Sequence, residues 1–154
     1  MEQGTDIYNG IQQTGLRRYE VFFAYSTEKE TPFQLRQTVE HKPTLEEVKQ
    51  VILGHINQVV QDKILMGLSY ADRIVWLSAE NQRNIAFAYT LAKGGDLTVM
   101  PTLKLGTDDD YIYYTFTDTQ EVIDFARLAQ LHIGNCLAEG RALRDRIDWS
   151  NYVI

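Results

Sequence analysis

Cysteine is almost absent from this chain: Cys136 is the single one in 154 residues. One cysteine excludes an intramolecular disulfide framework and any zinc cluster that needs several thiolates. Long apolar runs are absent too, because the longest are only a few residues against the ~20 that span a bilayer. Residues 1–6 show neither a signal-peptide nor a transit-peptide pattern. We therefore expect a soluble protein made in a reducing compartment, without a membrane partner.

Clustered positive charge is also lacking. The chain has 15 basic and 21 acidic residues, a net charge of −6. The nearest approaches to a basic patch are Arg17-Arg18 and the spaced Arg141, Arg144 and Arg146, and neither is interleaved with aromatic residues. A surface of this balance repels nucleic acid, so we expect no nucleic-acid partner.

The composition of the chain, with 44% hydrophobic residues, is that of an ordinary globular protein, and its length is typical of one domain. Residues 1–17 are polar and contain glycine breakers, which predicts a flexible N-terminal arm. Residues 18–43 contain two strand-forming segments, 19–25 and 33–39, joined by a polar connection, and we expect a β-hairpin there. Residues 44–154 are predicted to form the main α+β domain.

The first part of this domain has well-marked helix starts. Thr44 and Glu47 have the spacing of a capping box, and apolar residues then recur at helical spacing to about Gln61. The turn-punctuated stretch 64–77 favours two brief strands. Ser78 is a good N-cap for a second helix, which Gly94-Gly95 should end.

The C-terminal half predicts a second hairpin and a long helix. Residues 97–105 alternate, with Pro101 indicating an edge strand or a bulge, and a turn at 106–110 leads to a strand at 111–116. Thr117 and Gln120 are expected to cap a final helix of about 30 residues, in which Gly140 permits close approach of a neighbour. The fold class is therefore α+β: short antiparallel hairpins packed with three helices, the C-terminal one longest. A helix this long exceeds what one small sheet covers, which leaves part of its apolar stripe for another chain, including a second copy.

Candidate catalytic groups all have a structural interpretation that we favour. Asp108-Asp109-Asp110 lacks the spacing of a calcium loop and suits a solvated turn. A triad of Ser78, His132 and an acid has no supporting nucleophile motif, and Ser78 is explained as a cap. Cys136 occupies the apolar stripe and is expected to be inert. We therefore expect no enzyme, no cofactor and no metal site.

The aromatic hairpin strand is the best candidate for an interface. Its rings could stack on bases, but the segment 106–124 contains six acidic and no basic residues, which argues against that use. Tyrosine and tryptophan are enriched at protein contacts. The predicted protein-interface residues are Tyr111, Tyr113, Tyr114, Phe125, His132 and Trp149.

Several segments carry a family resemblance: residues 75–84 (VWLSAENQRN), 101–104, 113–116, 132–133, 137–141 and 145–149 (DRIDW). Together they resemble a domain of unknown function found in phages and prophages of gut bacteria. Members of that family often resemble tail-fibre-assembly proteins or lie among virion genes. The resemblance covers roughly residues 44–149, and it implies a phage context and a non-enzymatic role with no catalytic residues to transfer.

The resulting hypothesis is a virion structural protein or assembly adaptor that contacts other phage structural proteins, located in the virion and in the host cytoplasm during assembly. One alternative is a tail-fibre assembly chaperone that is not retained in the particle. Another is an acidic, host-directed regulatory protein that uses the acids of segment 106–124. An enzyme remains a third possibility, and it would need His132, Glu80 and Asp148 to converge in a cleft.

Overall fold

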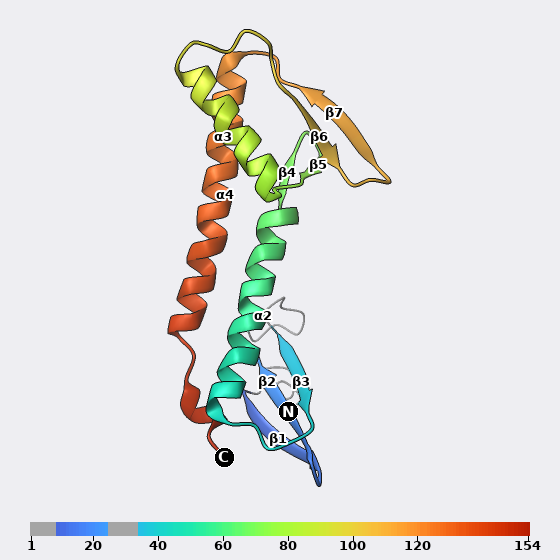
Figure 1. Ribbon diagram of the computed structural model, residues 1–154, viewed down its shortest axis with the longest axis vertical. Helices are drawn as coiled ribbons and strands as arrows, with labels where there is room; N and C mark the ends of the chain where they lie inside the picture. The colour runs from blue at the N-terminus through green and yellow to red at the C-terminus, as the bar shows by residue number, and fades with distance from the viewer. Residues whose placement is uncertain (1–8, 25–33) are drawn as a thin grey trace. The chain divides into compact units, whose positions relative to one another are not determined.

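The computed structural model describes residues 9–24 and 34–154, and it confirms the predicted α+β class. Within the described residues there are three antiparallel sheets and three helices, and the C-terminal helix, with 27 residues, is the longest (Figure 1). Contacts divide the chain into two compact units. Residues 1–60 with 139–154 form the first unit, and residues 61–138 form the second. Each unit is described by itself below.

The first unit contains a three-stranded antiparallel sheet in the order β1-β2-β3. Its strands are β1 (Gly10–Gly15), β2 (Arg18–Phe23) and β3 (Leu35–Val39). The β2–β3 pair confirms the predicted N-terminal hairpin. The prediction of a flexible arm is wrong for residues 10–15, because these residues pair with β2 from Gly10 opposite Phe22 to Gly15 opposite Arg18. Backbone hydrogen bonds hold an edge strand even when its side chains are polar, so polarity alone misled the prediction. Residues 1–8 of the predicted arm lie outside the described residues.

Helix α2 (Leu45–Met66) begins with the predicted capping box. The Thr44 N–H donates to the Glu47 carboxylate at 3.3 Å, and the Glu47 N–H donates back to the Thr44 hydroxyl at 3.2 Å. The helix is five residues longer than predicted, because Ile64 continues its apolar spacing and is buried. The predicted strand character of residues 64–66 is therefore wrong. The helix ends at Met66, and the N–H of the following Gly67 still donates to the Lys63 carbonyl at 2.8 Å.

The C-terminal residues complete the first unit. Gly140 permits the predicted close approach, since a Cβ there would lie 2.6 Å from the Val60 Cγ2 atom. After α4 the chain forms a short 3₁₀ helix, η1 (Trp149–Tyr152), for which Asp148 is the N-cap. Tyr152 is buried and donates its hydroxyl to the Phe22 carbonyl at 2.9 Å, which fixes the C-terminus against the sheet.

The second unit starts with the two brief strands predicted from the sequence, β4 (Leu68–Tyr70) and β5 (Arg73–Val75). Helix α3 (Ala79–Lys93) follows; the Ser78 hydroxyl caps it by accepting the Asn81 N–H at 3.1 Å, and Gly94 is its C-cap. Both of these predicted ends are confirmed.

The second hairpin consists of β6 (Thr102–Gly106) and β7 (Tyr111–Thr115). Strand β6 is shorter than predicted: residues 97–101 are not strand, although the Pro101 carbonyl still accepts the Phe116 N–H at 3.1 Å. Proline has no N–H to donate to a ladder, which is why pairing begins only after it.

Helix α4 (Thr119–Asp145) begins one residue later than a cap at Thr117 would place it. Asp118, not Thr117, accepts the Glu121 N–H, at 2.8 Å. Thr117 donates instead, from its N–H to the Glu121 carboxylate at 2.7 Å. An aspartate is at least as good an N-cap as a threonine, so adjacent candidates made the sequence ambiguous by one position.

Candidate functional site

The β6–β7 hairpin turns one face toward solvent. Cross-strand partners point to the same side of a sheet, and the register pairs Thr102 with Thr115, Lys104 with Tyr113, and Gly106 with Tyr111. We call the face formed by Thr102, Lys104, Tyr111, Tyr113 and Thr115 the hairpin surface. Tyr111 is 45% exposed and Tyr113 is 69% exposed. The hairpin therefore presents two tyrosine rings to solvent.

The two exposed rings are held in a defined arrangement. Tyr111 and Tyr113 pack edge-to-face with their centroids 5.6 Å apart, and the Lys104 Nζ lies 4.5 Å from the Tyr111 centroid. The same ammonium donates to the Asp108 carboxylate at 2.7 Å. This hydrogen bond raises the pKa of Lys104 and lowers the pKa of Asp108, so both stay charged at neutral pH. The hairpin surface thus combines exposed aromatic area with a solvent-exposed ion pair.

The acidic turn itself has the predicted structural role. The Thr107 N–H donates to the Asp110 carbonyl at 3.1 Å, and the Asp110 N–H donates to the Thr107 hydroxyl at 3.2 Å. A guanidinium nitrogen of Arg73 lies 3.4 Å from the Asp110 carboxylate. In the part of the chain that the structure describes, no group of three or more histidine, cysteine or acidic side chains is placed to hold a metal ion.

A hollow of about 280 Å³ lies beside the hairpin surface, between the hairpin and α3. Asn81 and Asn84 line it from α3, and Lys104 and Tyr113 line it from the hairpin. The Asn81 side chain is already used, since its amide donates to the Trp76 carbonyl at 2.6 Å. The hollow extends the hairpin surface with the side-chain amide of Asn84, beside a largely apolar lining that includes Leu103 and Phe116.

An aromatic cluster supports the hairpin from its other side. Tyr70 of β4 packs edge-to-face on Tyr114, at 5.6 Å between centroids, and on Phe125, at 4.8 Å. Phe116 lies 5.1 Å from Phe125. Phe125 is 2% exposed, so its predicted place in an interface is corrected: it belongs to the core, because the apolar stripe of α4 faces the hairpin at this point.

Glu121 holds this cluster in place through its carboxylate. It accepts the Tyr114 hydroxyl at 2.6 Å and the Tyr70 hydroxyl at 2.9 Å, besides the N–H and hydroxyl of Thr117. The Tyr114 hydrogen bond is the main cause that lowers the pKa of Glu121. Burial, followed by the hydrogen bond to Glu121, raises the pKa of Tyr70, and the Glu121 hydrogen bond raises the pKa of Tyr114.

At neutral pH the hydroxyls of Tyr70 and Tyr114 therefore stay protonated, and the Glu121 carboxylate stays ionised. The sequence analysis places Tyr114 in the interface, counts Glu121 only among the six acids of segment 106–124, and assigns Tyr70 no role. The signal for Glu121 was weak, because its two tyrosine partners lie on β4 and β7, which only the fold brings together.

His132 and Cys136 lie one helical turn apart on α4, with the Cys136 Sγ 3.7 Å from the His132 Nε2. The same Nε2 lies 2.8 Å from the Lys63 carbonyl. A carbonyl only accepts, so Nε2 carries a hydrogen and is not available to take the proton of the thiol. Cys136 is buried. His132 therefore ties α4 to the end of α2 within the second unit.

The remaining predicted residues have local structural partners in the first unit. Trp149 is half-buried, with the Lys49 Nζ 5.5 Å from its ring centroid and Tyr152 at 5.9 Å between centroids. The Asp148 carboxylate accepts the Ser150 N–H at 3.0 Å and the Ser150 hydroxyl at 2.6 Å, and these bonds lower the pKa of Asp148. Asp148 and His132 thus belong to different units and each has its own partner.

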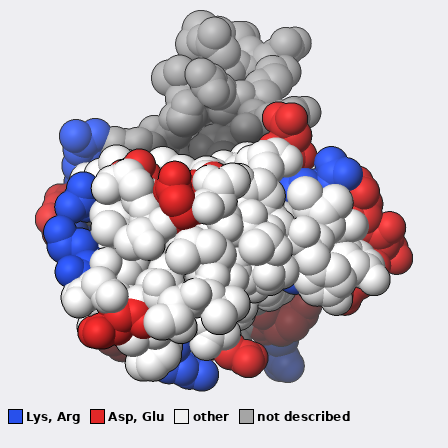
Figure 2. Space-filling model, turned by 90° about the horizontal axis from the view of Figure 1, so that it is seen from above, with Lys and Arg blue, Asp and Glu red and all other residues white. Residues whose placement is uncertain are grey.

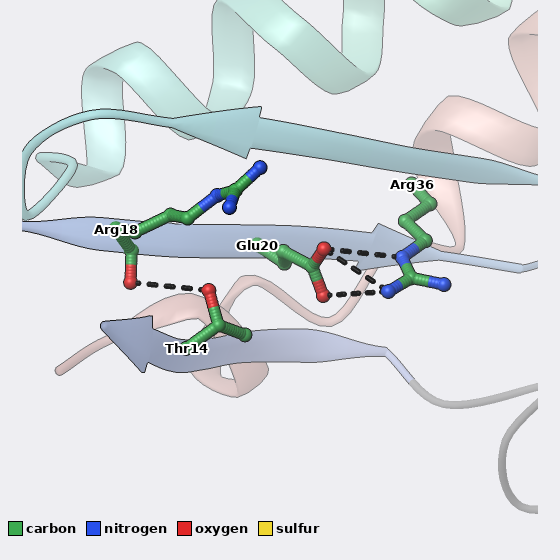
Figure 3. A network of polar contacts seen from close by, with 4 residues as sticks. All are labelled: Thr14, Arg18, Glu20 and Arg36. Carbon is green, nitrogen blue, oxygen red and sulfur yellow. Dashed lines mark hydrogen bonds and ion pairs between the residues drawn. The ribbon is translucent and has the colours of Figure 1, made fainter.

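Surface charge is mixed on the face that Figure 2 shows. Uncharged side chains make up most of this face, with acidic and basic groups mainly along its margin. The sheet of the first unit contains one such pair of opposite charges, in which two nitrogens of Arg36 on β3 contact the Glu20 carboxylate on β2 at 3.1–3.3 Å (Figure 3). The Thr14 hydroxyl of β1 donates to the Arg18 carbonyl at 3.4 Å in the same sheet. These contacts link neighbouring strands and have a structural role.

Comparison of the chain with protein families, with curated proteins and with solved structures finds no match. None of the described helices combines the length and the apolarity needed to cross a membrane. The hairpin surface is therefore the candidate site on its geometry alone.

Proposed function

We propose that this protein is a non-enzymatic interaction module of a bacteriophage, either a structural part of the virion or an adaptor in its assembly. The observation that supports docking is the hairpin surface, where Tyr111 and Tyr113 are exposed side by side on a supported strand pair. Rigid, exposed tyrosines supply large contact area at low entropic cost, and such residues dominate protein interfaces. The phage context rests on the sequence resemblance described above.

The structural support beneath the hairpin favours this function over catalysis. Glu121 and the hydroxyls of Tyr70 and Tyr114 satisfy one another, so the polar groups of this cluster support the hairpin and are hydrogen-bonded to one another. The partner we propose is another structural protein of the same phage. A preformed surface loses little freedom on binding, which suits an assembly contact.

The test uses particles of the phage that encodes this chain. Mass spectrometry of purified virions should detect the chain in a fixed ratio to the major structural proteins. Detection in infected cells but not in particles would support the tail-fibre assembly chaperone instead. Absence of any complex with phage proteins, in particles or in lysates of infected cells, would contradict the proposal.

Two substitutions separate the docking proposal from the acidic regulator. Tyr113→Ser removes an exposed ring, and we expect it to weaken binding to the phage partner at least about tenfold, the loss typical of a residue that dominates an interface. Asp109→Lys reverses one exposed charge of the turn and should change that affinity less than threefold, about the effect of one screened surface charge. The reverse pattern, with binding to a host protein abolished by Asp109→Lys, would favour the regulator.

A further inference from the structure

The hairpin of the second unit has an open outer edge. Strand β7 pairs with β6 on one side, and β5 contacts β6 on the side away from β7. In Figure 1, β7 is the outermost of these strands. Among the residues that the structure describes, no further strand pairs with β7. The outer side of β7 is therefore the free edge of this hairpin.

Hydrogen bonds just beyond both ends of the ladder show which of its pairs are bonded. The Phe116 N–H donates to the Pro101 carbonyl at one end, and the Thr107 N–H donates to the Asp110 carbonyl at the other. Bonded and non-bonded pairs alternate along an antiparallel ladder. Since both flanking pairs are bonded and share one register with the strands, every second pair counted inward from them is bonded as well.

Three residues of β7 consequently direct their backbone outward. Tyr111, Tyr113 and Thr115 occupy the non-bonded pairs, so their N–H and C=O groups point away from β6. All three residues are exposed, and within the described part of the chain no hydrogen bond to these outward groups is seen. An extended backbone beside β7 would satisfy all of them at once, because its own groups repeat at the same two-residue spacing.

Strand β7 lacks the features that protect edge strands from pairing. Such edges usually carry a charged residue, a proline or a bulge. Residues 111–117 include no charged residue and no proline, and the register of β7 has no shift. The outer strands of the first unit differ, because β1 has a register shift between Gln13 and Gly15 and β3 carries Arg36. Strand β7 is thus suited to accept a further strand.

Acidic residues lie beyond both ends of this edge. Two acids of the turn are paired with basic side chains, whereas Asp109 is exposed and forms no ion pair among the described residues. Beyond the other end, Asp118 is exposed and likewise forms no ion pair there. Strand β7 itself has five residues, none of them charged. A matching strand therefore has an uncharged core of similar length with basic residues at its ends.

We infer that the outer edge of β7 pairs with an extended segment of a partner protein, whose uncharged, β-forming core is flanked by basic residues. The added strand turns the hairpin into a three-stranded sheet, and its backbone hydrogen bonds supplement the contacts of Tyr111 and Tyr113. Strand addition to an open edge is a recurrent mode of peptide recognition. That the partner is a phage structural protein rests on the proposed function, whereas the pairing itself does not.

A second copy of β7 is a poorer occupant. Two copies related by a two-fold axis pair antiparallel, with the two Tyr113 residues opposite each other. In this register the turn of each copy, with Asp109, approaches residues 117–118 of the other, which include Asp118. Like charges at a contact oppose association. The added strand is therefore expected from a different protein.

The first test selects extended peptides on the purified full-length chain. A displayed library contains peptides of about nine residues, roughly 30 Å when extended, with uncharged cores and acidic, basic or neutral flanks. We expect enrichment of β-branched cores with basic flanks. No enrichment, or enrichment of acidic flanks, would overturn the inference.

Two variants at Thr115 then isolate one outward N–H, with the binding of an enriched peptide measured by fluorescence anisotropy. Thr115→Pro removes this donor and keeps the bonded pairs with β6, so the hairpin should persist, which circular dichroism checks. It should weaken binding at least about tenfold, because a hydrogen bond is lost and the proline ring obstructs the added strand. The matched control, Thr115→Ala, also loses the hydroxyl contact with Thr102 but keeps the N–H, and should bind nearly as well as the wild type. Equal binding by the two variants would contradict strand pairing.

N-methylated peptides test the same pairing without altering the chain. An enriched peptide is methylated at either the odd or the even backbone nitrogens of its core. Only one of the two sets should abolish binding, because alternate residues of a strand face the same edge. Equal losses with both sets, or no loss with either, would refute the inference.

Further outcomes separate this inference from the proposed function. If the phage partner binds both Thr115 variants equally but loses affinity for Tyr113→Ser, docking on the hairpin surface holds and strand pairing fails. If peptides pair with β7 as expected but no phage protein binds the chain, strand pairing holds and the proposed function fails. Sedimentation equilibrium should show a monomer, and a dimer that Thr115→Pro dissociates would make a second copy the occupant and overturn the inference.

Discussion

At the residue scale, Glu121 connects three elements of the second unit. Its carboxylate accepts hydroxyls from Tyr70 on β4 and Tyr114 on β7, and the N–H of Thr117 before α4. These donors lower the pKa of Glu121 below its ordinary value of 4.5. At a pH near 4.5, Glu121 is therefore protonated in a smaller fraction of folded molecules than of unfolded ones. The Glu121 carboxylate therefore contributes its full stabilisation of the folded state above about pH 4.5. This contribution is lost as the pH falls through the lower pKa that Glu121 has in the folded protein.

The first prediction is that Glu121→Gln lowers the melting temperature at neutral pH by about 2–4 °C, since a charged acceptor of several hydrogen bonds is lost. The difference from the wild type should shrink as the pH is lowered below 4.5, and differential scanning calorimetry across this range measures it. Glu80→Gln, an acid in the first turn of α3, is the matched control and should change little. A difference that stays constant with pH would contradict the role assigned to the Glu121 carboxylate.

At the element scale, two glycines of α2 differ in how much space surrounds them: Gly54 lies inside the helix, and Gly67 follows its last residue. A Cβ on Gly67 would lie 2.3 Å from the Lys63 carbonyl oxygen and 3.1 Å from the His132 Cε1 atom. A Cβ on Gly54, in the middle of the helix, would meet nothing within 4 Å. The end of α2 is thus closed by a residue that must lack a side chain, while Gly54 only weakens the helix.

The second prediction follows from that contrast. Gly67→Ala should lower the free energy of unfolding by about 1–3 kcal/mol, because backbone or the His132 ring must move. Gly54→Ala should raise it by up to about 1 kcal/mol, through helix propensity alone. Urea unfolding followed by circular dichroism gives both values. Equal effects of the two substitutions would show that the Gly67 contacts do not hold in solution.

The starts of α2 and α3 and the end of α3 were predicted at the correct residues, the start of α4 was missed by one residue, and the end of α2 and strand β1 were predicted wrongly. Thr44 with Glu47 and Ser78 were identified correctly, because a cap is a local pattern of a side chain and a nearby N–H. The length of α2 was underestimated, and β1 was missed, because burial of Ile64 and pairing of residues 10–15 depend on neighbours that are remote in sequence.

At the scale of the whole molecule, two helices run through both compact units. Helix α2 crosses the boundary at residues 60–61, and α4 crosses it at residues 138–139. Helix formation is cooperative, so unfolding of one unit removes hydrogen-bonded neighbours from the helices of the other. The two units should therefore unfold together.

The third prediction is a single thermal transition, measured by calorimetry with equal calorimetric and van't Hoff enthalpies. Gly67→Ala acts in the second unit, and Gly140→Ala, whose Cβ would lie 2.6 Å from the Val60 Cγ2 atom, acts in the first. Both should shift that one transition downward. Gly134→Ala, also on α4 but with nothing within 4 Å of its Cβ, is the control. Two separate transitions, with each variant shifting only one, would show that the units unfold independently.

The amino-acid sequence by itself determined the α+β class, the order of the elements from residue 18 onward and the hairpin that carries Tyr111 and Tyr113, because period, caps and turns are local properties. The tertiary structure alone decided which aromatic residues are surface and which are core. Tyr113 and Phe125 were indistinguishable as candidates, yet one is 69% exposed and the other 2%. It alone also placed Tyr70 and Tyr114 on Glu121. These features arise where segments distant in sequence meet, and no local pattern records which side chain a remote element will cover.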